Sequence, residues 1–454
     1  MRTKFAPQLY IDFSGRSSLK VVNQYRAKYK RMSEILRANP LIVFLAHRDW
    51  SKMLSTSRAG RKSGFTSEQI LRALIVMFVE QDSYRQVVVR IENSEFLKHF
   101  VGLGPKQMMD FSFLSRAMGI LSKATVDAMN DVLGEYATGE EMISGEKLRL
   151  DTTVYEVNIH YPTDSSLLWD GFRTLARLLK QVQKELPRLG IGHRYHVKKV
   201  KKLAYFIARN GSSNSKSKKR KVKSTYRTLI DRVRWIVGVA QEALDLLDCA
   251  GWEADELQHF VPIIQRIIHQ AEQRVLHGIM LPADQKVYSL FEEHTELIMR
   301  GKAGKPIEYG HKVLIAQTAQ KFIHHYQVLP KQRDDIQLLA PTIKAHQRLF
   351  GVMPEVLTTD KGFYQSMDQI EGLEQEIETV SICKKGRRTK EQYQRESTEA
   401  FIDGQRFRAG CEGSISVLKR VFKLGMCHFK GYKNYAASVG CAVLCHNLVT
   451  LARL

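Results

Sequence analysis

The sequence has few of the features that mark secreted and membrane proteins. Its 454 residues include only six cysteines, whose spacing forms no disulfide framework, and this is typical of a reducing compartment. The longest apolar run, around Leu71–Val79, is far shorter than the roughly 20 residues that a spanning helix needs. The opening stretch MRTKFAPQLYIDFSG contains no apolar signal core. These absences favour a cytoplasmic protein without a membrane segment.

Acidic residues are also scarce relative to basic ones. The chain has 70 Lys and Arg against 47 Asp and Glu, a net charge of +23. A positive field of this size favours an anionic partner, with nucleic acid first and an anionic membrane surface second. The membrane alternative is weaker because the basic stretch lacks an amphipathic aromatic face. The length predicts two or three domains.

The first half of the chain is predicted to be mostly helical. Residues 1–140 contain apolar residues at helical spacing, and we expect helices at Ser67–Gln81, Ser83–Asn93 and Ser112–Ala137. The segment KLRLDTTVYEVNI, from residue 147, is rich in β-branched and aromatic residues and predicts a strand. Helical patterning returns over 164–278.

Strand patterning resumes in the second half. We expect strands within 286–330, at VYSLF and in YGHKVLIAQTAQKFIHHYQVL, and then a helix over Asp334–Phe350. The segment PEVLTTD predicts a short strand that ends at Asp360, and 388–424 and 433–452 predict helices. This order indicates an α/β core that is interrupted by an all-helical insertion.

The predicted insertion contains an unusually basic stretch. Residues 198–234 hold fourteen Lys or Arg and one Asp. The middle part, RNGSSNSKSKKRKVKS, has low complexity and predicts a flexible loop that faces DNA. KKRKV also resembles a nuclear import signal, which is the less favoured interpretation. The predicted DNA-binding residues of this stretch are Lys216, Lys218, Lys219, Arg220 and Lys221.

Two aspartates follow strand patterns. In LRLDTTV the apolar residues alternate onto one face, so Asp151 points to the other face of a predicted central strand. A charge there is costly unless it is paired or binds a cation. Asp360 ends EVLTTD, and the carboxyl ends of strands are where open α/β sheets place ligands. A role in a turn or a helix cap is the alternative for each aspartate.

Glu412 is the only Asp or Glu between Gly404 and Leu454, a stretch with eight Lys or Arg. Helical geometry places it on a basic ridge beside an apolar stripe. The other members of the ridge are Arg408, Ser416, Lys419 and Lys423, and the stripe contains Cys411, Ile415, Leu418 and Phe422. Glu412 could pair with Arg408 at i−4, which contributes a few tenths of a kcal/mol.

Three acids from two strands and a helix suit phosphoryl transfer with two metal ions. Mg²⁺ prefers oxygen ligands and shares them with substrate phosphates. Arg408, Lys419 and Lys423 would then hold DNA phosphates. The spacing alone does not show that the three acids meet.

Several segments resemble bacterial insertion-sequence transposases of the DDE class. In the glutamate region Arg408, Glu412 and Lys419 fit the family pattern of Tyr, two residues, Arg, three, Glu, six, Lys, while Gln405 stands at the Tyr position. The segments that carry the resemblance are TSEQILRALIVMFVEQDSYRQV, LDTTVYEVNIHYPTDSSLLWDG, KAGKPIEYGHKV, LTTDKGFY, RFRAGCEGSISVLKR and GYKNYAASVGCAVLCHNLVTLARL.

The resemblance, closest to the ISNCY type, implies a fold and a reaction. The fold would be an RNase H-like mixed sheet with an N-terminal helical domain and an all-helical insertion after the first core strand. Residues 1–140 would bind the element's DNA ends, 141–163 and 284–454 would form the catalytic core, and 164–283 would be the basic insertion. Asp151, Asp360 and Glu412 would bind two Mg²⁺ ions, for which Mn²⁺ would substitute.

The implied substrate is double-stranded DNA, both the element's terminal inverted repeats and its target. The protein would act as a homodimer or larger complex in the bacterial cytoplasm, in association with the nucleoid. Two alternatives stay open at this point. One is a DNA-binding protein that descends from a transposase and lacks catalysis, and the other is an RNase H-like nuclease that cuts without joining.

Overall fold

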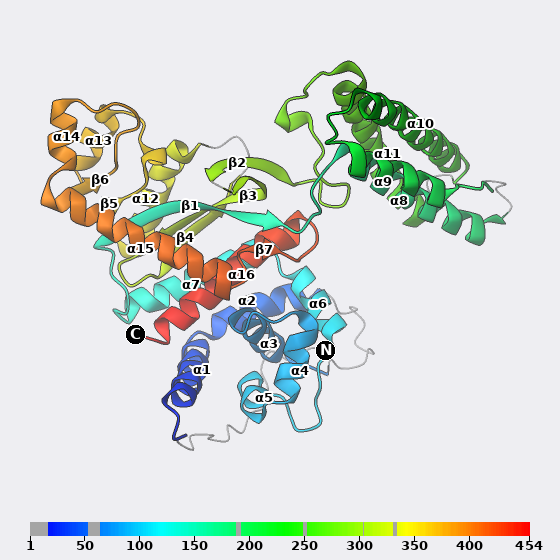
Figure 1. Ribbon diagram of the computed structural model, residues 1–454. Helices are drawn as coiled ribbons and strands as arrows, with labels where there is room; N and C mark the ends of the chain where they lie inside the picture. Colours follow the sequence, from blue (N-terminus) through cyan, green and yellow to red (C-terminus); the bar gives the residue numbers. More distant parts are fainter. Residues whose placement is uncertain (1–16, 53–63, 188–191, 248–251, 303, 330–333) are drawn as a thin grey trace. The chain divides into compact units, whose positions relative to one another are not determined.

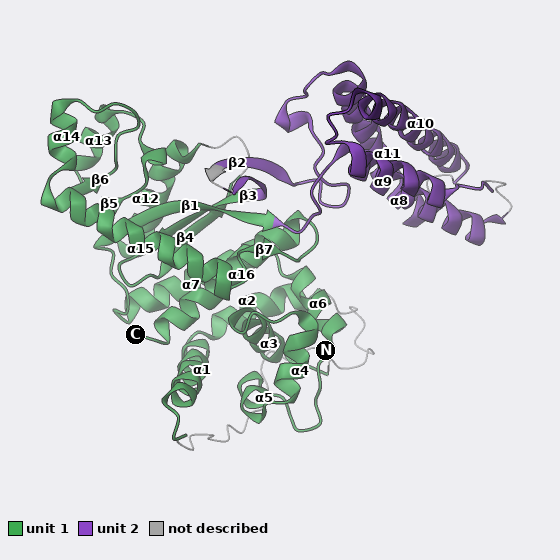
Figure 2. Ribbon diagram, in the orientation of Figure 1, with its two compact units in different colours: residues 1–156, 311–454 green, residues 157–310 purple. Residues whose placement is uncertain are grey.

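A computed structural model of the protein describes residues 17–52, 64–187, 192–247, 252–302, 304–329 and 334–454. The opening stretch, residues 1–15, lies outside them. The chain forms two compact units, one of residues 1–156 and 311–454 and the other of residues 157–310 (Figure 2). The N-terminal helices therefore share a unit with much of the sheet.

The N-terminal helices begin where the sequence supplies hydrogen-bonding caps. Thr66 and Ser83 each accept the backbone N–H three residues later and form capping boxes with Gln69 and Gln86. The helices are α1 (Lys20–Ala38), α2 (Pro40–Ser51), α3 (Ser67–Val79), α4 (Tyr84–Glu92), α5 (Glu95–Val101), α6 (Phe111–Ile120) and α7 (Lys123–Gly139).

The helix predicted over Ser112–Ala137 is wrong in one respect, because α6 ends at Ile120 and α7 starts at Lys123. Ser122 breaks the run: its side chain accepts the N–H of Thr125 and caps α7, while its own N–H donates to Asp49. The helices predicted at Ser67–Gln81 and Ser83–Asn93 are confirmed as α3 and α4.

The sheet is mixed, as expected. Its order is β2-β3-β1-β5-β6, with β4 paired to β3 and β7 paired to β1. β1 is parallel to β5, and β5 is parallel to β6, whereas β3 is antiparallel to β2 and to β4. The strands are β1 (Lys147–Val157), β2 (Glu296–Lys302), β3 (Lys305–Gln317), β4 (Ile323–Val328), β5 (Val356–Thr358), β6 (Thr379–Ser381) and β7 (Met426–Cys427).

Helices cover the sheet of the first unit (Figure 1). α15 (Glu399–Val421) packs on β5 and β6, and α16 (Tyr432–Leu451) packs against α7 and β4. A core of Leu148, Leu150 and Leu357 with residues from the η4 (Asp335–Leu338) and α12 (Leu339–Phe350) region fills the space beside the strands. Short elements complete this region: η5 (Lys361–Phe363), α13 (Met367–Glu374) and α14 (Lys390–Glu396).

Three predictions for the second half of the chain need correction. VYSLF forms no strand, because Val287 and Leu290 instead pack into the core of the helical unit. The helix predicted over 388–424 is two helices, α14 and α15, which Thr398 separates by capping α15. The strand before Asp360 ends at Thr358. The helix over Asp334–Phe350 is confirmed as η4 and α12.

The second unit is built mainly from the insertion between β1 and β2. α8 (Asp164–Glu185), α9 (Val197–Asn210), α10 (Lys216–Leu246) and α11 (Trp252–Ala271) pack around one apolar core. Shorter turns at η2 (Glu272–His277) and η3 (Ala283–Gln285) follow. The helical character predicted for this insertion is confirmed in the described residues.

The flexible loop predicted in the basic stretch is wrong. α9 continues to Asn210 and α10 starts at Lys216, so only 211–215 connect them. Lys and Arg are good helix formers, and the later part of α10 is anchored by the buried Leu229 and Ile236. A helix that is anchored by packing propagates into the neighbouring residues at little cost.

Among the described residues, no helix has the length and apolar content needed to cross a membrane.

Candidate active site

Asp151 lies in β1 and is largely buried, with 14% of its side chain exposed. Its Oδ1 accepts the N–H of Thr152 at 2.7 Å. Burial raises the pKa of Asp151 to about 6, the negative charges of Asp360 and Glu412 add to the rise, and the Thr152 N–H and the Arg408 charge oppose it. The structure therefore keeps a carboxyl group in a place where its charge is poorly stabilised by the protein alone.

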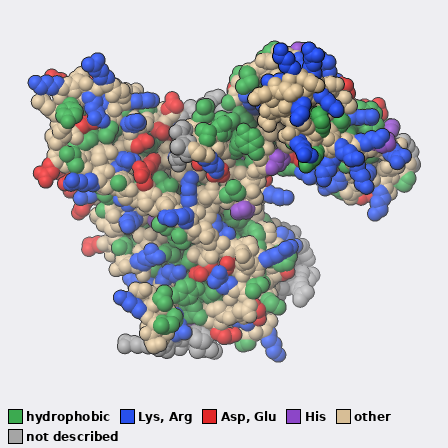
Figure 3. Space-filling view, in the orientation of Figure 1, with side chains coloured by type: hydrophobic (Ala, Val, Ile, Leu, Met, Phe, Trp, Pro, Cys, Tyr) green, Lys and Arg blue, Asp and Glu red, His purple; other side chains and the backbone are tan. Residues whose placement is uncertain are grey.

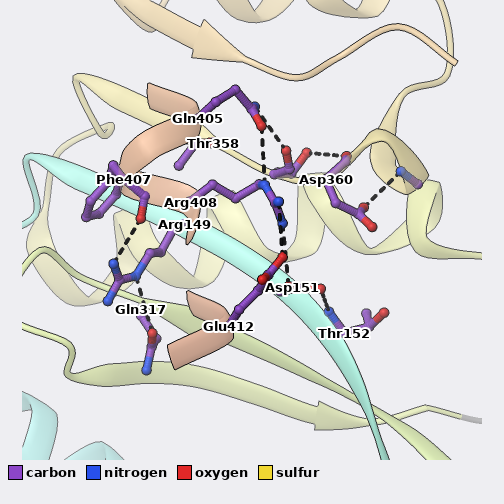
Figure 4. A network of polar contacts seen from close by, with 12 residues as sticks. Arg149, Asp151, Thr152, Gln317, Thr358, Asp360, Gln405, Phe407, Arg408 and Glu412 are labelled. Carbon is purple, nitrogen blue, oxygen red and sulfur yellow. Dashed lines mark hydrogen bonds and ion pairs between the residues drawn. The ribbon is translucent and has the colours of Figure 1, made fainter. Parts of the chain in front are cut away.

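Asp360 lies beside Asp151 because β1 and β5 are parallel neighbours. In the parallel register Arg149 of β1 lies opposite Thr358 of β5. Asp151 and Asp360 each follow two residues later, so the same register places them next to each other. Asp360 Oδ1 accepts the N–H of Gly362 at 2.8 Å and caps η5. The capping role that the sequence analysis gave as the alternative for Asp360 is thus present. The cap also holds the Asp360 carboxylate beside Asp151 (Figure 4).

Glu412 approaches the pair from α15, but its side chain is 64% exposed. Arg408 Nη2 donates to Glu412 Oε1 at 3.2 Å, and Arg408 Nη1 lies 3.7 Å from Asp151 Oδ2. The i−4 ion pair is therefore formed, and the same guanidinium also reaches the strand (Figure 4). Arg408 links the carboxylates of two elements that are far apart in the sequence.

Close backbone approach fixes α15 against the sheet. A Cβ on Gly404 would lie 2.5 Å from the Cβ of Ser381, and a Cβ on Gly410 would collide with the guanidinium of Arg149. Glycine at both positions lets the helix backbone lie against these side chains. The distance between Glu412 and the strands depends on this contact.

Arg149 is a supporting residue that the sequence analysis missed. It is 3% exposed and donates to the backbone oxygen of Phe407 at 3.0 Å and to Gln317 Oε1 at 3.3 Å. Its guanidinium also lies 4.7 Å from the centre of the Phe407 ring. The available signal was a basic residue two positions before Asp151, on the strand face that carries the acid.

Gln405 is a second residue that supports the site, and the sequence analysis did not predict this function for it. Its Nε2 donates to the backbone oxygen of Ser381 at 2.7 Å, and its Oε1 accepts from Arg408 Nε at 3.2 Å. Gln405 occupies the place where the transposase pattern has tyrosine. Here it ties α15 to β6 and orients Arg408.

The donor set suits a hard divalent cation, although the side chains are not arranged as a closed metal site. Within the described ranges, no three His, Cys, Asp or Glu side chains are grouped closely enough to hold a metal ion. Two aspartates are neighbours and Glu412 is turned toward Arg408. The donors are all carboxylate oxygens, which Mg²⁺ prefers, and burial together with the neighbouring carboxylates raises the pKa of Asp151.

The predicted basic residues fall in different places. Lys419 lies in the last turn of α15, but the helix ends at Val421, so the ridge predicted to include Lys423 stops before it. Lys423 has a left-handed backbone (φ 64°). Burial lowers its pKa, and the charge of Asp82 opposes this. The five predicted cations of the insertion are exposed on the first turns of α10 in the second unit.

A basic groove of about 780 Å³ lies between α9 and α10 in that unit. Tyr205, which is 66% exposed, and Phe206 line it together with cations, and the Lys221 ammonium lies 5.4 Å from the centre of the Phe206 ring. The polar lining residues are Lys198, Lys201, Lys202, Arg209, Asn210 and Lys218. Most of these cations belong to α9, which lies in the basic stretch 198–234 but contributed no residue to the predicted DNA-binding set.

A comparison with known families gives one match, to the later part of the chain. Residues 298–448, about a third of the chain, match the family described as the transposase DDE domain. This segment is therefore similar to the DDE domain of transposases, and the resemblance that the motifs predicted is confirmed at this level. The match includes Asp360 and Glu412, whereas Asp151 precedes it. Searches of curated proteins and of solved structures gave no significant match.

Proposed function

We propose that this protein is the DNA transposase of an insertion sequence, which binds the terminal inverted repeats and catalyses metal-dependent cleavage and strand transfer. One observation carries the proposal. The parallel pairing of β1 with β5 puts Asp151 beside Asp360, and α15 brings Glu412 to the same edge. Two of these three carboxylates belong to the matched transposase domain.

Asp151, Asp360 and Glu412 are proposed to hold two Mg²⁺ ions, with Mn²⁺ as a substitute. When bound, such ions stabilise negative charge on the attacking and leaving oxygens of a phosphodiester. The exposure of the Glu412 side chain leaves it free to turn from Arg408 toward the two aspartates. Arg408 would then be available to a DNA phosphate, for which its forked geometry is suited.

The surrounding residues maintain this geometry. Gln405 orients the Arg408 guanidinium through the 3.2 Å hydrogen bond, and Arg149 holds the middle of α15 through the backbone of Phe407. Burial of Asp151 keeps water away from one side of its carboxylate, which strengthens its interaction with any cation. These residues are assigned a positioning role.

DNA binding is assigned to two further parts of the chain. The exposed cations of α9 and α10 suit contacts with the phosphate backbone, and Tyr205 in their groove offers an aromatic surface for a base. Recognition of the terminal repeats is assigned to the N-terminal helices by analogy with the family. A dimer or larger complex would be required to bring two ends together.

The test is a cleavage and joining assay with labelled terminal repeats taken from the DNA that borders the gene. The full-length protein should nick and join these ends with Mg²⁺ or Mn²⁺. Asp151→Asn, Asp360→Asn and Glu412→Gln should each lower product formation by more than about 100-fold, because the loss of supporting residues alone costs 10- to 100-fold at metal sites. Full activity in all three correctly folded variants would show that the site assignment is wrong.

The same assay separates the alternatives. Products that are cut but never joined would identify a nuclease. DNA binding of normal strength without metal-dependent cleavage would identify a DNA-binding protein that has lost catalysis.

A further inference from the structure

The turn between β6 and α14 has the sequence KKGRRTK, and five of its seven residues are Lys or Arg. We call Lys384–Lys390 the basic turn. It belongs to the first unit and to the matched transposase domain. None of its residues was included in the DNA-binding set predicted from the sequence.

The basic turn is held in one conformation by a buried acid. Glu396, whose side chain is 6% exposed, accepts the backbone N–H of Lys384 at 2.8 Å and Arg388 Nε at 2.8 Å. Gly386 provides the left-handed residue at the tip (φ 94°). Thr389 caps α14 and ends the turn. These contacts hold the backbone of the turn at its start and its end.

This arrangement leaves three cations directed to solvent. Lys385, Arg387 and Lys390 are exposed, and within the part of the chain that the structure describes they take part in no ion pair. The two other cations have protein partners: Arg388 pairs with Glu396, and Lys384 Nζ donates to Gln392 at 2.6 Å. Arg388 neutralises Glu396, and the basic turn itself contains no acid, the next carboxylate along the chain being Glu391 in the first turn of α14.

A depression of about 380 Å³ joins the basic turn to α15. Tyr393, which is 62% exposed, and Ile402, which is 40% exposed, offer apolar surface there. We call it the Tyr393 depression. Its other wall includes Gln405, the residue that orients Arg408.

A chain of hydrogen bonds connects this surface to the catalytic candidates. Ser381 ends β6 three residues before the basic turn, and its backbone oxygen accepts from Gln405. Gln405 Oε1 accepts from Arg408, whose guanidinium lies 3.7 Å from Asp151. These contacts link the end of β6, next to the basic turn, through α15 to the carboxylate of Asp151.

We infer that the basic turn binds the phosphodiester backbone of the DNA strand that continues from the reacting phosphate, with one nucleoside against Tyr393. The inference rests on the proposed function and assigns a part of the substrate to this surface. Fixed cations attract a polyanion at little cost in ordering, and an exposed tyrosine stacks on any base regardless of sequence. A DNA strand supplies both groups at a regular spacing.

The test compares two triple variants of the full-length protein. One is Lys385→Ala/Arg387→Ala/Lys390→Ala in the basic turn. The control is Lys147→Ala/Lys344→Ala/Arg348→Ala, which removes three exposed cations from the start of β1 and from α12. Joining rates are measured over a range of concentrations of a pre-cut DNA end, and DNA affinity is measured over a range of salt concentrations.

The turn variant should raise KM about tenfold or more and leave kcat within about twofold, because binding is lost while the carboxylates are unchanged. Its slope of log K against log salt should fall in magnitude by about 2 to 3, since each lost phosphate contact accounts for roughly 0.7 to 0.9. The control should change KM less than about threefold. Tyr393→Ala should weaken binding at least fivefold, and Tyr393→Phe should retain it.

A turn variant whose KM and salt slope match those of the control would overturn the inference and leave the transposase function intact. If the wild-type protein bound DNA but joined none, the proposed reaction would fail, while the salt slopes would still decide whether the turn contacts DNA.

Discussion

At the scale of single residues, the carboxyl of Asp151 is costly to the metal-free protein. Its pKa is raised to about 6 by burial and by two neighbouring acids, so at pH 7 the fold must carry a charge that it stabilises poorly. Active sites commonly contain groups that are retained for function at the expense of stability. Arg408 offsets part of this cost through its approach to Asp151.

Asp151→Asn should therefore stabilise the metal-free protein at pH 7. The sign follows from the raised pKa: the fold favours the uncharged carboxyl, and removing the charge relieves the penalty that is present above the unfolded pKa of about 3.9. We expect a gain of about 1 to 2 kcal/mol in the free energy of unfolding, measured by urea denaturation with EDTA. Asp403→Asn, which alters an exposed acid, should change stability by less than about 0.5 kcal/mol. A loss of stability in Asp151→Asn would contradict this description.

A second residue-scale effect concerns a buried histidine on α16. His446 is 5% exposed, and burial lowers its pKa to about 4, with Arg453 and Lys321 adding to the effect and a hydrogen bond to Asn447 opposing it. The unfolded chain binds this proton near pH 6.5, so stability is lost as pH falls from 6.5 toward 4. His446→Gln should reduce the loss of unfolding free energy between pH 7 and pH 5 by about 2 kcal/mol. His269→Gln, at an exposed position of α11, is the matched control.

At the scale of elements, α15 matters most because it carries Glu412 and also Arg408, whose guanidinium reaches Asp151 on β1. Two of its glycines respond differently to a methyl group. At Gly410 the added Cβ would collide with Arg149, whereas at Gly413 it would meet nothing within 4 Å. The helix therefore contains a packing glycine and an unconstrained glycine three residues apart.

Gly410→Ala should destabilise the protein by about 1 to 3 kcal/mol, the usual cost of overpacking, and should lower joining activity by displacing Glu412. Gly413→Ala should instead be neutral or stabilise by up to about 1 kcal/mol, because alanine is the better helix former. Thermal unfolding of both variants distinguishes the two effects. Equal stability of the two would indicate that α15 can shift away from Arg149 without cost.

Elements with strong local patterns could be predicted from the sequence, and those that depend on distant partners could not. β1 was evident from its alternation, and α3 and α4 from apolar residues at helical spacing. β2, with the sequence ELIMRGK, has polar residues and a glycine, and it is a strand because β3 pairs with it. β6 has only three residues, too few to show a period. The segment RNGSSNSKSKKRKVKS, predicted as a flexible loop, is helical from Lys216 because packing further along α10 anchors it.

Sequence patterns singled out Asp151, Asp360 and Glu412 as candidates, but they did not show that the three meet. Asp151 lies beside Asp360 because β1 and β5 pair in parallel, which the two strand patterns alone do not specify. The position of Glu412 depends on the close packing of α15 at Gly404 and Gly410. It also depends on the hydrogen bond between Arg149 and Phe407, which are more than 250 residues apart in the sequence. Arg408 contacts both Asp151 on β1 and Glu412 on its own helix. The contact with Asp151 could be seen only in the tertiary structure.

At the scale of the whole molecule, the positive charge is unevenly distributed. Lys and Arg side chains gather on the second unit (Figure 3), where residues 198–234 carry fourteen of them. Neutralising Lys216, Lys218, Lys219, Arg220 and Lys221 should weaken DNA binding and reduce the slope of log K against log salt by up to about 4, because counterion release scales with phosphate contacts. Changing the four lysines to arginine should preserve the slope. An unaltered slope in the neutral variant would exclude these residues from the DNA interface.

The central claim is that Asp151, Asp360 and Glu412 form one metal site. Mn²⁺ binding, measured by calorimetry on the wild-type protein and on Asp151→Asn, Asp360→Asn and Glu412→Gln, tests it most directly. Each substitution should weaken Mn²⁺ binding by at least about tenfold while the protein stays folded. Wild-type Mn²⁺ affinity in Glu412→Gln would contradict the claim, because it would leave the glutamate as a partner of Arg408 alone.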